Sequence, residues 1–379
     1  MKIVYVCNEY PPAPHGGVGT FVRMLAHAMK GRGHRVTVVG IGREQASWDD
    51  DGVRVEILRG SGNSRLSALA NRWRLWRWLQ AARQQFGVDI VEVPEFEGML
   101  PLPLSGAVVR LHLSLTEILQ QSGQRVPPMI RALEYWTLRS QTSWIGVSQY
   151  VLDRTRSTFC LTPRHATVIL NPASLPDPAS ASRCPALPAR FVLYAGAVSR
   201  RKGAYTVAEA ARNFLVACPD VDLVFIGATS VEEGVDSGVR VLQIVGPALQ
   251  HRVHLMGRLR HDQVAWCMRK AEVFVGTSFL EAFGLCAAEA MLAGLPCVLS
   301  DDPPFTEFAR QEETALLVPP ADVEGVAASV MRLLSDADLR SRLGQRAAQE
   351  MKSRFALEEC ARATEAFYAE MLAAGASAG

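Results

Sequence analysis

The sequence lacks the features that would assign it to a membrane-spanning, nucleic-acid-binding or disulfide-rich class. No apolar run approaches the roughly 18 residues that a membrane-spanning helix needs. Its 40 Lys and Arg nearly balance 38 Asp and Glu, which leaves no basic footprint for nucleic acid. Its eight cysteines form no Cys-x-x-Cys pair or zinc-ligand spacing, which is typical of a reduced compartment. With 49% hydrophobic and 21% charged residues, the 379-residue chain is predicted to be globular, with room for two domains.

The N-terminus also lacks the pattern of a signal peptide. The apolar stretch "MKIVYVC" is short, and "NEYPP" follows it at once, without a small-residue cleavage site. We therefore interpret these residues as a first buried strand and expect a cytoplasmic protein.

Strand-like and helix-like segments alternate along the chain, which predicts an α/β protein with parallel sheets and right-handed crossovers. The pattern runs through residues 1–172, pauses in a proline-rich segment at 173–189, and restarts over 190–354. A final helix is expected at 355–372. Two doubly wound, Rossmann-like domains joined by a linker and facing a cleft would bind ligands at the carboxyl ends of their strands.

A basic loop, "GAVSRRKG" at 196–203, follows the first predicted strand of the second domain and opens a helix. Arg201 and Lys202 would stand beside the free amides of the helix start, which suits a diphosphate. A charged run is more often a solvated turn, so this loop by itself does not decide the function.

A second loop, in "SFLEAFGLCAAEA", carries two acids eight residues apart. Glu281 falls in the loop, and Glu289 falls on a helix that begins near Gly284. A helix through both would separate them by about 12 Å, too far for a shared proton or metal. A diphosphate between Lys202 and the amides of Gly284 and its neighbour would leave Glu289 for two ribose hydroxyls and Glu281 for a sugar. The ligand outlined in this way is a nucleoside diphosphate sugar.

The pair Glu281 and Glu289 resembles the E-x7-E motif of the retaining GT-B glycosyltransferases of family 4, also called glycosyl transferases group 1. The resemblance runs almost from end to end, and its best segments are "NEYPPAPHGGVGTFVRMLAHAMKGRGHRVTVV", "VVRLHLSL", "VSQYVLDR", "NPASLP", "GTSFLEAFGLCAAEAMLAGLPCVLSD" and "ALLVPPADVEGVAASVMRLLSD". The spacing of the two acids is a weak signal, whereas the ordered set of segments is specific.

For the second domain, this resemblance implies a donor-binding role. Glu289 would bind the ribose. Glu281 would contact the donor sugar, together with backbone amides near Phe283, Gly284 and Leu285.

For the remaining site residues, the resemblance implies that Arg201 and Lys202 hold the diphosphate. Gly16 and Gly17 would let the first-domain loop approach the phosphates and the acceptor. His112 would lie near the donor sugar, so that His112, Arg201, Lys202 and Glu281 form the catalytic set. The final helix would cross back to the first domain. The implied reaction is a front-face, retaining transfer of a hexose that needs no cofactor and no metal.

One position departs from the family pattern. The family usually has Arg directly after the glycine of the basic loop, where this sequence has Ala197. One cation of the diphosphate clamp is therefore missing, and Arg200 or Arg201 would have to replace it. The departure also leaves open a non-catalytic paralogue that only binds nucleotide sugars.

Two other enzyme classes fit less well. The segment "HGGVG" at 15–19 lacks the third glycine of a dinucleotide-binding fingerprint, and no acid ends the second strand. The sequence therefore fits a dehydrogenase poorly. A nucleotide-sugar epimerase or hydrolase on the same fold would need an acid/base pair beside the sugar, distinct from Glu281. His112 outside this family context would most often be a core histidine.

The segment "NRWRLWRWLQAAR" at 71–83 joins tryptophans with arginines. Such a helix can lie on an anionic membrane surface. A lipid-linked acceptor would be found at the inner face of the membrane. The competing interpretation is an ordinary helix whose buried stripe contains Leu69, Trp73, Trp76 and Leu79.

The expected partners are a UDP- or GDP-sugar and a hydroxyl acceptor. The acceptor could be a glycan, a lipid-linked molecule or a small molecule, in cell-surface polysaccharide or glycolipid biosynthesis.

Overall fold

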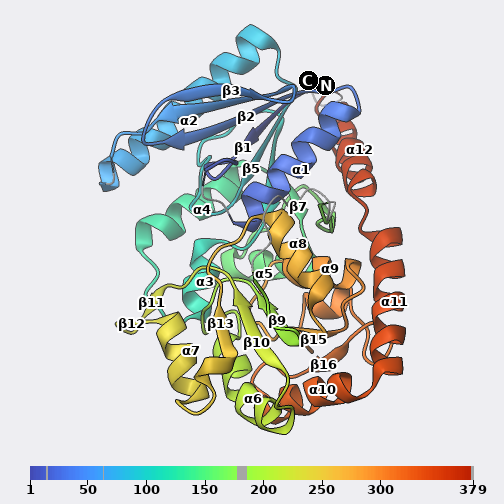
Figure 1. The fold of residues 1–379 in the computed structure, drawn as a ribbon. Coiled ribbons are helices and arrows are strands. Elements are labelled where there is room, and N and C mark those ends of the chain that lie inside the picture. Colours follow the sequence, from blue (N-terminus) through green and yellow to red (C-terminus); the bar gives the residue numbers. More distant parts are fainter. Residues whose placement is uncertain (14–15, 63, 177–185, 377–379) are drawn as a thin grey trace. The chain divides into compact units, whose positions relative to one another are not determined.

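The computed structural model describes residues 1–13, 16–62, 64–176 and 186–376, and divides the chain into two compact units (Figure 1). Unit 1 comprises Met1–Pro172 and Leu357–Gly379, and unit 2 comprises Ala173–Ala356. Half of the proline-rich segment expected as a linker, residues 177–185, lies outside the described residues.

Unit 1 is built around an eight-stranded sheet in the order β3-β4-β2-β1-β5-β6-β7-β8. All of its pairings are parallel except that of β3 with β4. The strands are β1 (Lys2–Val6), β2 (Arg35–Gly42), β3 (Ala46–Asp50), β4 (Val53–Arg59), β5 (Ile90–Pro94), β6 (Ala107–Leu111), β7 (Ser143–Gly146) and β8 (His165–Val168). The helices are α1 (Gly17–Gly31), α2 (Arg65–Phe86), α3 (Leu115–Gln121), α4 (Pro128–Ser140), α5 (Gln149–Phe159) and α12 (Leu357–Ala376).

The central strands of this sheet are buried on both faces, as continuous apolar runs such as "KIVYV" predict for parallel strands covered by helices. Helix α1 packs on the sheet through Phe21, Val22, Leu25 and Met29, all buried. Strands β3 and β8 were not predicted, because their sequences, "ASWDD" and "HATV", have little apolar content. Both lie at the edges of the sheet, where partial exposure is tolerated.

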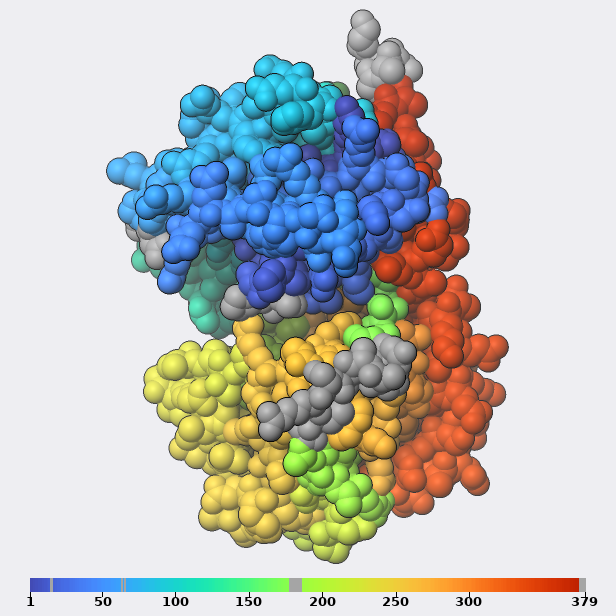
Figure 2. All heavy atoms as spheres, turned by 45° about the horizontal axis from the view of Figure 1, so that its top comes forward, coloured from blue at the N-terminus to red at the C-terminus, as the bar shows by residue number. Residues whose placement is uncertain are grey.

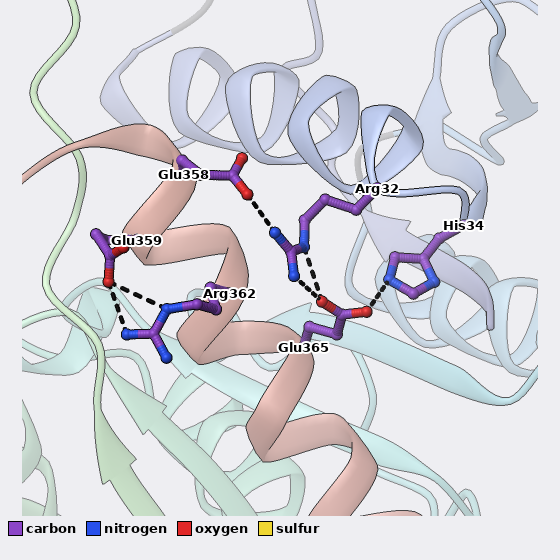
Figure 3. Close-up of polar contacts among 6 residues, drawn as sticks. All are labelled: Arg32, His34, Glu358, Glu359, Arg362 and Glu365. Atoms are coloured by element: carbon purple, nitrogen blue, oxygen red, sulfur yellow. Dashed lines mark hydrogen bonds and ion pairs between the residues drawn. The ribbon is translucent and has the colours of Figure 1, made fainter.

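The C-terminal helix α12 belongs to unit 1, although the whole of unit 2 precedes it in the sequence. In Figure 3, Arg32 at the end of α1 binds Glu358 and Glu365, and His34 contacts Glu365 at 2.9 Å. Figure 2 shows α12 lying against the N-terminal segments of its own unit. The predicted return of the last helix to the first domain is confirmed.

A buried polar cluster fixes this helix more deeply. Arg110 binds Glu92 through two hydrogen bonds of 2.7 and 2.9 Å and also donates to Thr364. The hydroxyl of Tyr368 donates to Glu92 at 2.6 Å. Because Glu92 and Arg110 lie on β5 and β6 while Thr364 and Tyr368 lie on α12, the docked helix adds two hydrogen bonds to a buried ion pair of the sheet.

Unit 2 has a six-stranded parallel sheet in the order β13-β10-β9-β14-β15-β16. Its strands are β9 (Phe191–Ala195), β10 (Asp222–Ile226), β13 (Val253–Leu255), β14 (Val273–Gly276), β15 (Cys297–Ser300) and β16 (Leu316–Val318), and a small hairpin comprises β11 (Val231–Glu232) and β12 (Val235–Asp236). The helices are α6 (Ala204–Ala217), α7 (Ser237–Val245), α8 (His261–Lys270), α9 (Leu285–Leu292), α10 (Val323–Ser335) and α11 (Ala337–Arg354).

The strand order of unit 2 decides where its loops lie. Strand β9 is hydrogen-bonded to β14 in parallel, with β10 on its other side. The carboxyl ends of β9 and β14 are therefore neighbours, and the loops that follow them, 196–203 and 277–284, emerge side by side. The predicted α/β class, with parallel sheets in both halves, is confirmed.

Candidate functional site

The two loops of unit 2 are hydrogen-bonded to each other. The backbone N–H of Phe279 donates to the carbonyl oxygen of Arg201 at 2.9 Å, and the guanidinium of Arg201 donates to the carbonyl oxygen of Leu280 at 3.2 Å. The hydroxyl of Ser278 reaches the carbonyl oxygen of Lys202 at 3.4 Å. The basic loop and the acidic loop thus form one surface at the carboxyl ends of two adjacent strands.

A glycine makes this close approach feasible. Gly203 has φ +75°, a left-handed conformation, and a Cβ on it would lie 2.0 Å from the carbonyl oxygen of Thr277. Only glycine relieves both the backbone strain and the contact. The glycine that ends "SRRKG" therefore lets the β9 loop lie directly against the β14 loop.

Lys202 and Glu281 meet at this surface as an ion pair. The hydroxyl of Ser278 also donates to Glu281, at 3.1 Å. Both charged side chains keep part of their surface exposed, so a ligand can reach them. The predicted diphosphate cation and the predicted sugar-binding acid lie together, and each satisfies the other here.

The start of α9 offers backbone amides beside these residues. Gly284 precedes the helix with φ +92°, and no side chain caps the amides. Phe283 is buried and packs at a tilt against Phe308 and Phe355, with ring centroids 5.2 and 5.9 Å away. Phe283 therefore anchors the turn by its ring, and only its backbone is placed to act on a ligand. Leu285 is the first residue of the helix.

Glu289 lies on α9 and is 5% exposed. Its Oε1 lies 2.8 Å from Nε2 of His261, the first residue of α8. Burial opposes protonation of the imidazole, but the hydrogen bond to Glu289 and the charges of Glu289 and Asp262 outweigh it and raise the pKa of His261. Sequence reasoning missed His261, because the contact joins two helices 28 residues apart.

The position that departs from the family pattern, Ala197, is exposed in the β9 loop, and its carbonyl oxygen accepts a hydrogen bond from Tyr194 at 2.8 Å. Of the two arginines considered as replacements, Arg200 lies over the ring of Tyr205 at 5.6 Å. Arg201 is the arginine joined to the loop of Glu281 through Leu280. The geometry therefore favours Arg201 as the replacement.

In unit 1, His112 follows β6 at the carboxyl edge of the sheet. Its backbone N–H donates to the buried Glu95 at 2.6 Å, and its ring packs edge-on against Phe21 with centroids 5.3 Å apart. Burial and, second, the positive charge of Arg110 lower the pKa of His112 to about 3. The imidazole is therefore neutral near pH 7, so it can donate one hydrogen bond and accept another.

Three buried glutamates support the backbone around His112, and none was singled out from the sequence. Glu134 accepts from the backbone N–H groups of residues 97, 115 and 116 at 2.7 to 3.1 Å, and Glu117 forms a capping box with Ser114. Burial and, next, the charge of Glu117 hold the pKa of Glu95 well above its usual range. The spacing "SLTE" carried the capping signal; the other two contacts are long-range.

The glycines of the first loop lie at the start of α1. Gly16 is exposed and precedes the helix, and Gly17 is its first residue. The carboxylate of Glu9 accepts from the N–H groups of Gly16 at 3.1 Å and Gly19 at 2.9 Å. An internal carboxylate thus occupies the amide of Gly16, in the loop that the resemblance brings close to the phosphates and the acceptor. Residues 14 and 15 of the same loop lie outside the described residues.

The surface of α2 corrects the expected buried stripe. Leu75, Leu79 and Ala82 are buried, whereas Leu69 is 47% and Trp73 51% exposed. The helix is fixed in this rotation because the buried Arg72 donates to the carbonyl oxygens of residues 97 and 98. Leu79 was therefore placed correctly, whereas Leu69 and Trp73 point outward and Trp76 is half-buried against the stacked ring of Trp73.

The described residues contain neither a metal-ligand cluster nor a membrane-spanning helix. No three His, Cys, Asp or Glu side chains gather there in a way that could hold a metal ion. Within the same part of the chain, no helix combines the length and the apolarity needed to cross a membrane.

Two protein-family models match this chain. Residues 15–175 match the model of "Glycosyltransferase Family 4", and residues 185–350 match "Glycosyl transferases group 1". The two matches divide the chain as the two compact units do. The chain belongs to the family 4 (group 1) glycosyltransferases.

This family 4 glycosyltransferase also resembles individual proteins over nearly its whole length. It is 24% identical to the glycogen synthase of Mycobacterium tuberculosis, over 97% of this chain and 94% of that protein. Among solved structures, sucrose-phosphate synthase from Thermosynechococcus elongatus has a TM-score of 0.79 at 21% identity, covering 98% and 99% of the two chains. HepE of Anabaena, in complex with UDP and glucose, has a TM-score of 0.71 at 18% identity, covering 96% and 98%. These likenesses establish the GT-B fold, and the family establishes a transferase.

Proposed function

We propose that this transferase moves a hexose, with retention of configuration, from a UDP- or GDP-sugar to a hydroxyl acceptor in cell-surface polysaccharide or glycolipid biosynthesis. The observation that carries the proposal is the joined surface of the β9 and β14 loops. It presents Lys202, Arg201, Glu281 and the uncapped start of α9 within one unit. A similar fold that binds UDP and glucose, in HepE, supports a nucleotide-sugar donor.

In the proposed reaction, the leaving diphosphate is stabilised by Lys202, Arg201 and the N–H groups of Gly284 and Leu285. These are cations and oriented dipoles that need no reorganisation as charge develops on the leaving oxygen. When the donor binds, Lys202 exchanges Glu281 for a phosphate oxygen, and Glu281 becomes free to accept hydrogen bonds from sugar hydroxyls.

Retention here is not assigned to a pair of carboxylates as in glycosidases, which need two such groups about 5 Å apart across the sugar. Glu281 pairs with Lys202, and Glu289 pairs with His261, so each acid has its own partner. We propose front-face attack instead, in which the leaving diphosphate helps to remove the acceptor proton and the protein contributes positioning and charge stabilisation.

We propose that residues of unit 1 act in the same reaction. A neutral His112 can bind a sugar hydroxyl without competing with the lysine and arginine for the diphosphate. Gly16 and Gly17 would let their loop approach the phosphates and the acceptor. The N–H of Gly16 becomes available to a ligand once Glu9 moves away.

The first test is thermal unfolding with UDP, GDP, ADP, CDP and NAD, each with and without EDTA. A ligand at about 100 times its Kd adds roughly 2.7 kcal/mol of stability, which raises the unfolding midpoint visibly. We expect a selective rise with UDP or GDP that EDTA does not remove, because the basic groups replace a metal. A rise with NAD alone, or one that needs metal, would contradict the proposal.

The second test distinguishes transfer from the two alternatives on this fold. The protein is incubated with the donor identified in the first test and with candidate hydroxyl acceptors, and the products are analysed by NMR. A new glycoside with the anomeric configuration of the donor supports retaining transfer. Release of free sugar alone would indicate a hydrolase, and an altered nucleotide sugar would indicate an epimerase.

We also propose that α2 contacts an anionic membrane surface at the inner face of the membrane. Its outward side carries Leu66, 79% exposed, together with Leu69 and Trp73. Exposed Arg74 and Arg77 accompany them, and the helix sequence contains no acidic residue. Apolar and basic side chains together suit an anionic interface.

Co-sedimentation with phosphatidylglycerol vesicles, compared with phosphatidylcholine vesicles, tests this contact. We expect binding only to the anionic vesicles, weakened in Trp73→Ala but unchanged in Phe86→Ala, which removes another exposed apolar side chain at the end of the same helix. Equal binding to both vesicle types, or none, would contradict the membrane role.

A further inference from the structure

The carboxylate of Glu289, which the proposed function assigns to the ribose, is held by the protein on one side only. The side chain is almost fully buried on α9, yet its carboxylate has only one protein hydrogen bond among the described residues, from His261 to Oε1. The other oxygen, Oε2, has no hydrogen-bond partner within this part of the chain. A largely buried carboxylate with one oxygen held by a histidine and the other without a partner among the described residues is prepared to accept hydrogen bonds from a ligand.

His261 is itself held firmly. It is the first residue of α8, whose start is closed by a capping contact in which the backbone N–H of Arg260 donates to Gln263 at 3.0 Å. The neighbouring Asp262 is bound by the guanidinium of Arg260 at 2.6 and 3.1 Å. The imidazole therefore extends from a fixed helix end to Glu289 on the neighbouring helix, and α8 packs against α9.

We propose that His261 is a positioning residue that holds the carboxylate of Glu289 in the one orientation that binds the two ribose hydroxyls of the donor. This inference rests on the proposed function, which gives Glu289 its ribose role. The Nε2–H group occupies one lone pair of Oε1 and leaves the remaining lone pairs of the carboxylate for the 2′- and 3′-hydroxyls. Without His261 the carboxylate can rotate, and the ligand must then immobilise it on binding.

Calorimetric titration with UDP and with 2′,3′-dideoxy-UDP tests this role. If the first test selects GDP, the titration uses GDP and 2′,3′-dideoxy-GDP instead. The expected result for His261→Ala is a UDP affinity weakened roughly five- to tenfold, the loss that goes with ordering one side chain on binding. The affinity for the dideoxy analogue, which lacks the hydroxyls, is expected to stay unchanged. His261→Gln is expected to restore most of the UDP affinity, because its amide N–H can donate to Glu289.

His254→Ala is the matched control. His254 also pairs with an acid, Asp222, through Nε2 at 2.7 Å in the same unit, and we assign it no ligand role. It should leave both affinities unchanged. Equal loss of UDP and dideoxy-UDP binding in His261→Ala would mean a general structural role and would overturn the inference, as would an unchanged UDP affinity.

Glu289→Ala separates the inference from the proposed function beneath it. If this variant no longer distinguishes UDP from dideoxy-UDP while His261→Ala still does so fully, the inference about His261 alone is wrong. If Glu289→Ala keeps the full preference for UDP, the ribose role of Glu289 is wrong, and the inference fails with it.

Discussion

Lys202 and Glu281 form an ion pair although they lie on different loops, because those loops follow two adjacent parallel strands, β9 and β14. The sequence predicted a cation for phosphate and an acid for sugar, but not that each would satisfy the other when no ligand is bound. A ligand with a negative diphosphate next to a hydroxyl-bearing sugar can replace both partners at once. An uncharged sugar or a free phosphate would satisfy only one of them.

Alanine substitutions of the two acids of the E-x7-E motif are expected to impair different steps, turnover in one case and nucleotide binding in the other. Glu281→Ala should reduce kcat by roughly 10²-fold or more, because its contact is with the reacting sugar. Glu289→Ala should instead weaken UDP or GDP binding by roughly tenfold or more, the contribution of hydrogen bonds to a charged group. Steady-state kinetics together with calorimetry separates the two effects. Near-normal turnover in Glu281→Ala, with an unchanged unfolding midpoint, would refute its assignment.

Restoring the missing arginine should strengthen the phosphate site. Ala197 is exposed in the basic loop, so Ala197→Arg can place a cation there without displacing the core. We expect nucleoside diphosphate to bind roughly three- to tenfold more tightly, through a charge-assisted hydrogen bond. Ala197→Gln, similar in length but uncharged, is the control. An equal gain in both variants would show that charge at this position is irrelevant.

The low pKa of His112 predicts both its charge and its effect on stability. The unfolded chain takes up a proton near pH 6.5, whereas the folded imidazole stays neutral down to about pH 3. Stability from this residue is therefore complete above pH 6.5 and decreases as the pH falls, by up to about 2 kcal/mol at pH 5.

Histidine-selective NMR measures this directly. The His112 resonance, identified by its loss in His112→Asn, should not titrate between pH 8 and pH 5. Titration near pH 6.5 would mean that the imidazole is solvated and charged at the pH where the diphosphate binds, and would contradict its assignment as a neutral hydrogen-bonding group.

A matched pair of glycine variants tests the contact between the two loops. Gly203→Ala introduces both left-handed backbone strain at φ +75° and a Cβ 2.0 Å from Thr277. Gly87→Ala introduces the same kind of strain at φ +62°, but its Cβ would meet only the flexible end of Lys2, at 3.5 Å. Backbone strain of this kind costs about 1 to 2 kcal/mol.

We expect Gly203→Ala to lower the unfolding midpoint several degrees further than Gly87→Ala and also to weaken nucleoside diphosphate binding. Thermal unfolding and calorimetry of both variants provide the comparison. The same decrease in both, with binding intact, would show that the loops do not need their close approach.

The sequence by itself determined the buried strands, most of the helices and the chemistry of the loops, although not the edge strands β3 and β8. Apolar runs such as "FVLYAG" and "AEVFVG" predicted buried parallel strands, and the structure places β9 and β14 there. The turn at Gly284 and the helix carrying Glu289 followed from local patterns of glycine and helical spacing. These features are local, because backbone conformation and short-range capping depend on neighbouring residues.

Only the tertiary structure decided which of these groups meet. That β9 pairs with β14, that His261 reaches Glu289, and that Leu69 and Trp73 face outward on α2 all depend on contacts between residues far apart in the sequence. The rotation of α2 that buries Leu75 and Leu79 is also the one in which Arg72 reaches the carbonyl oxygens of a distant loop. Such contacts are chosen by the packing and hydrogen bonding of the whole unit, and hydrophobic periodicity carries no information about them.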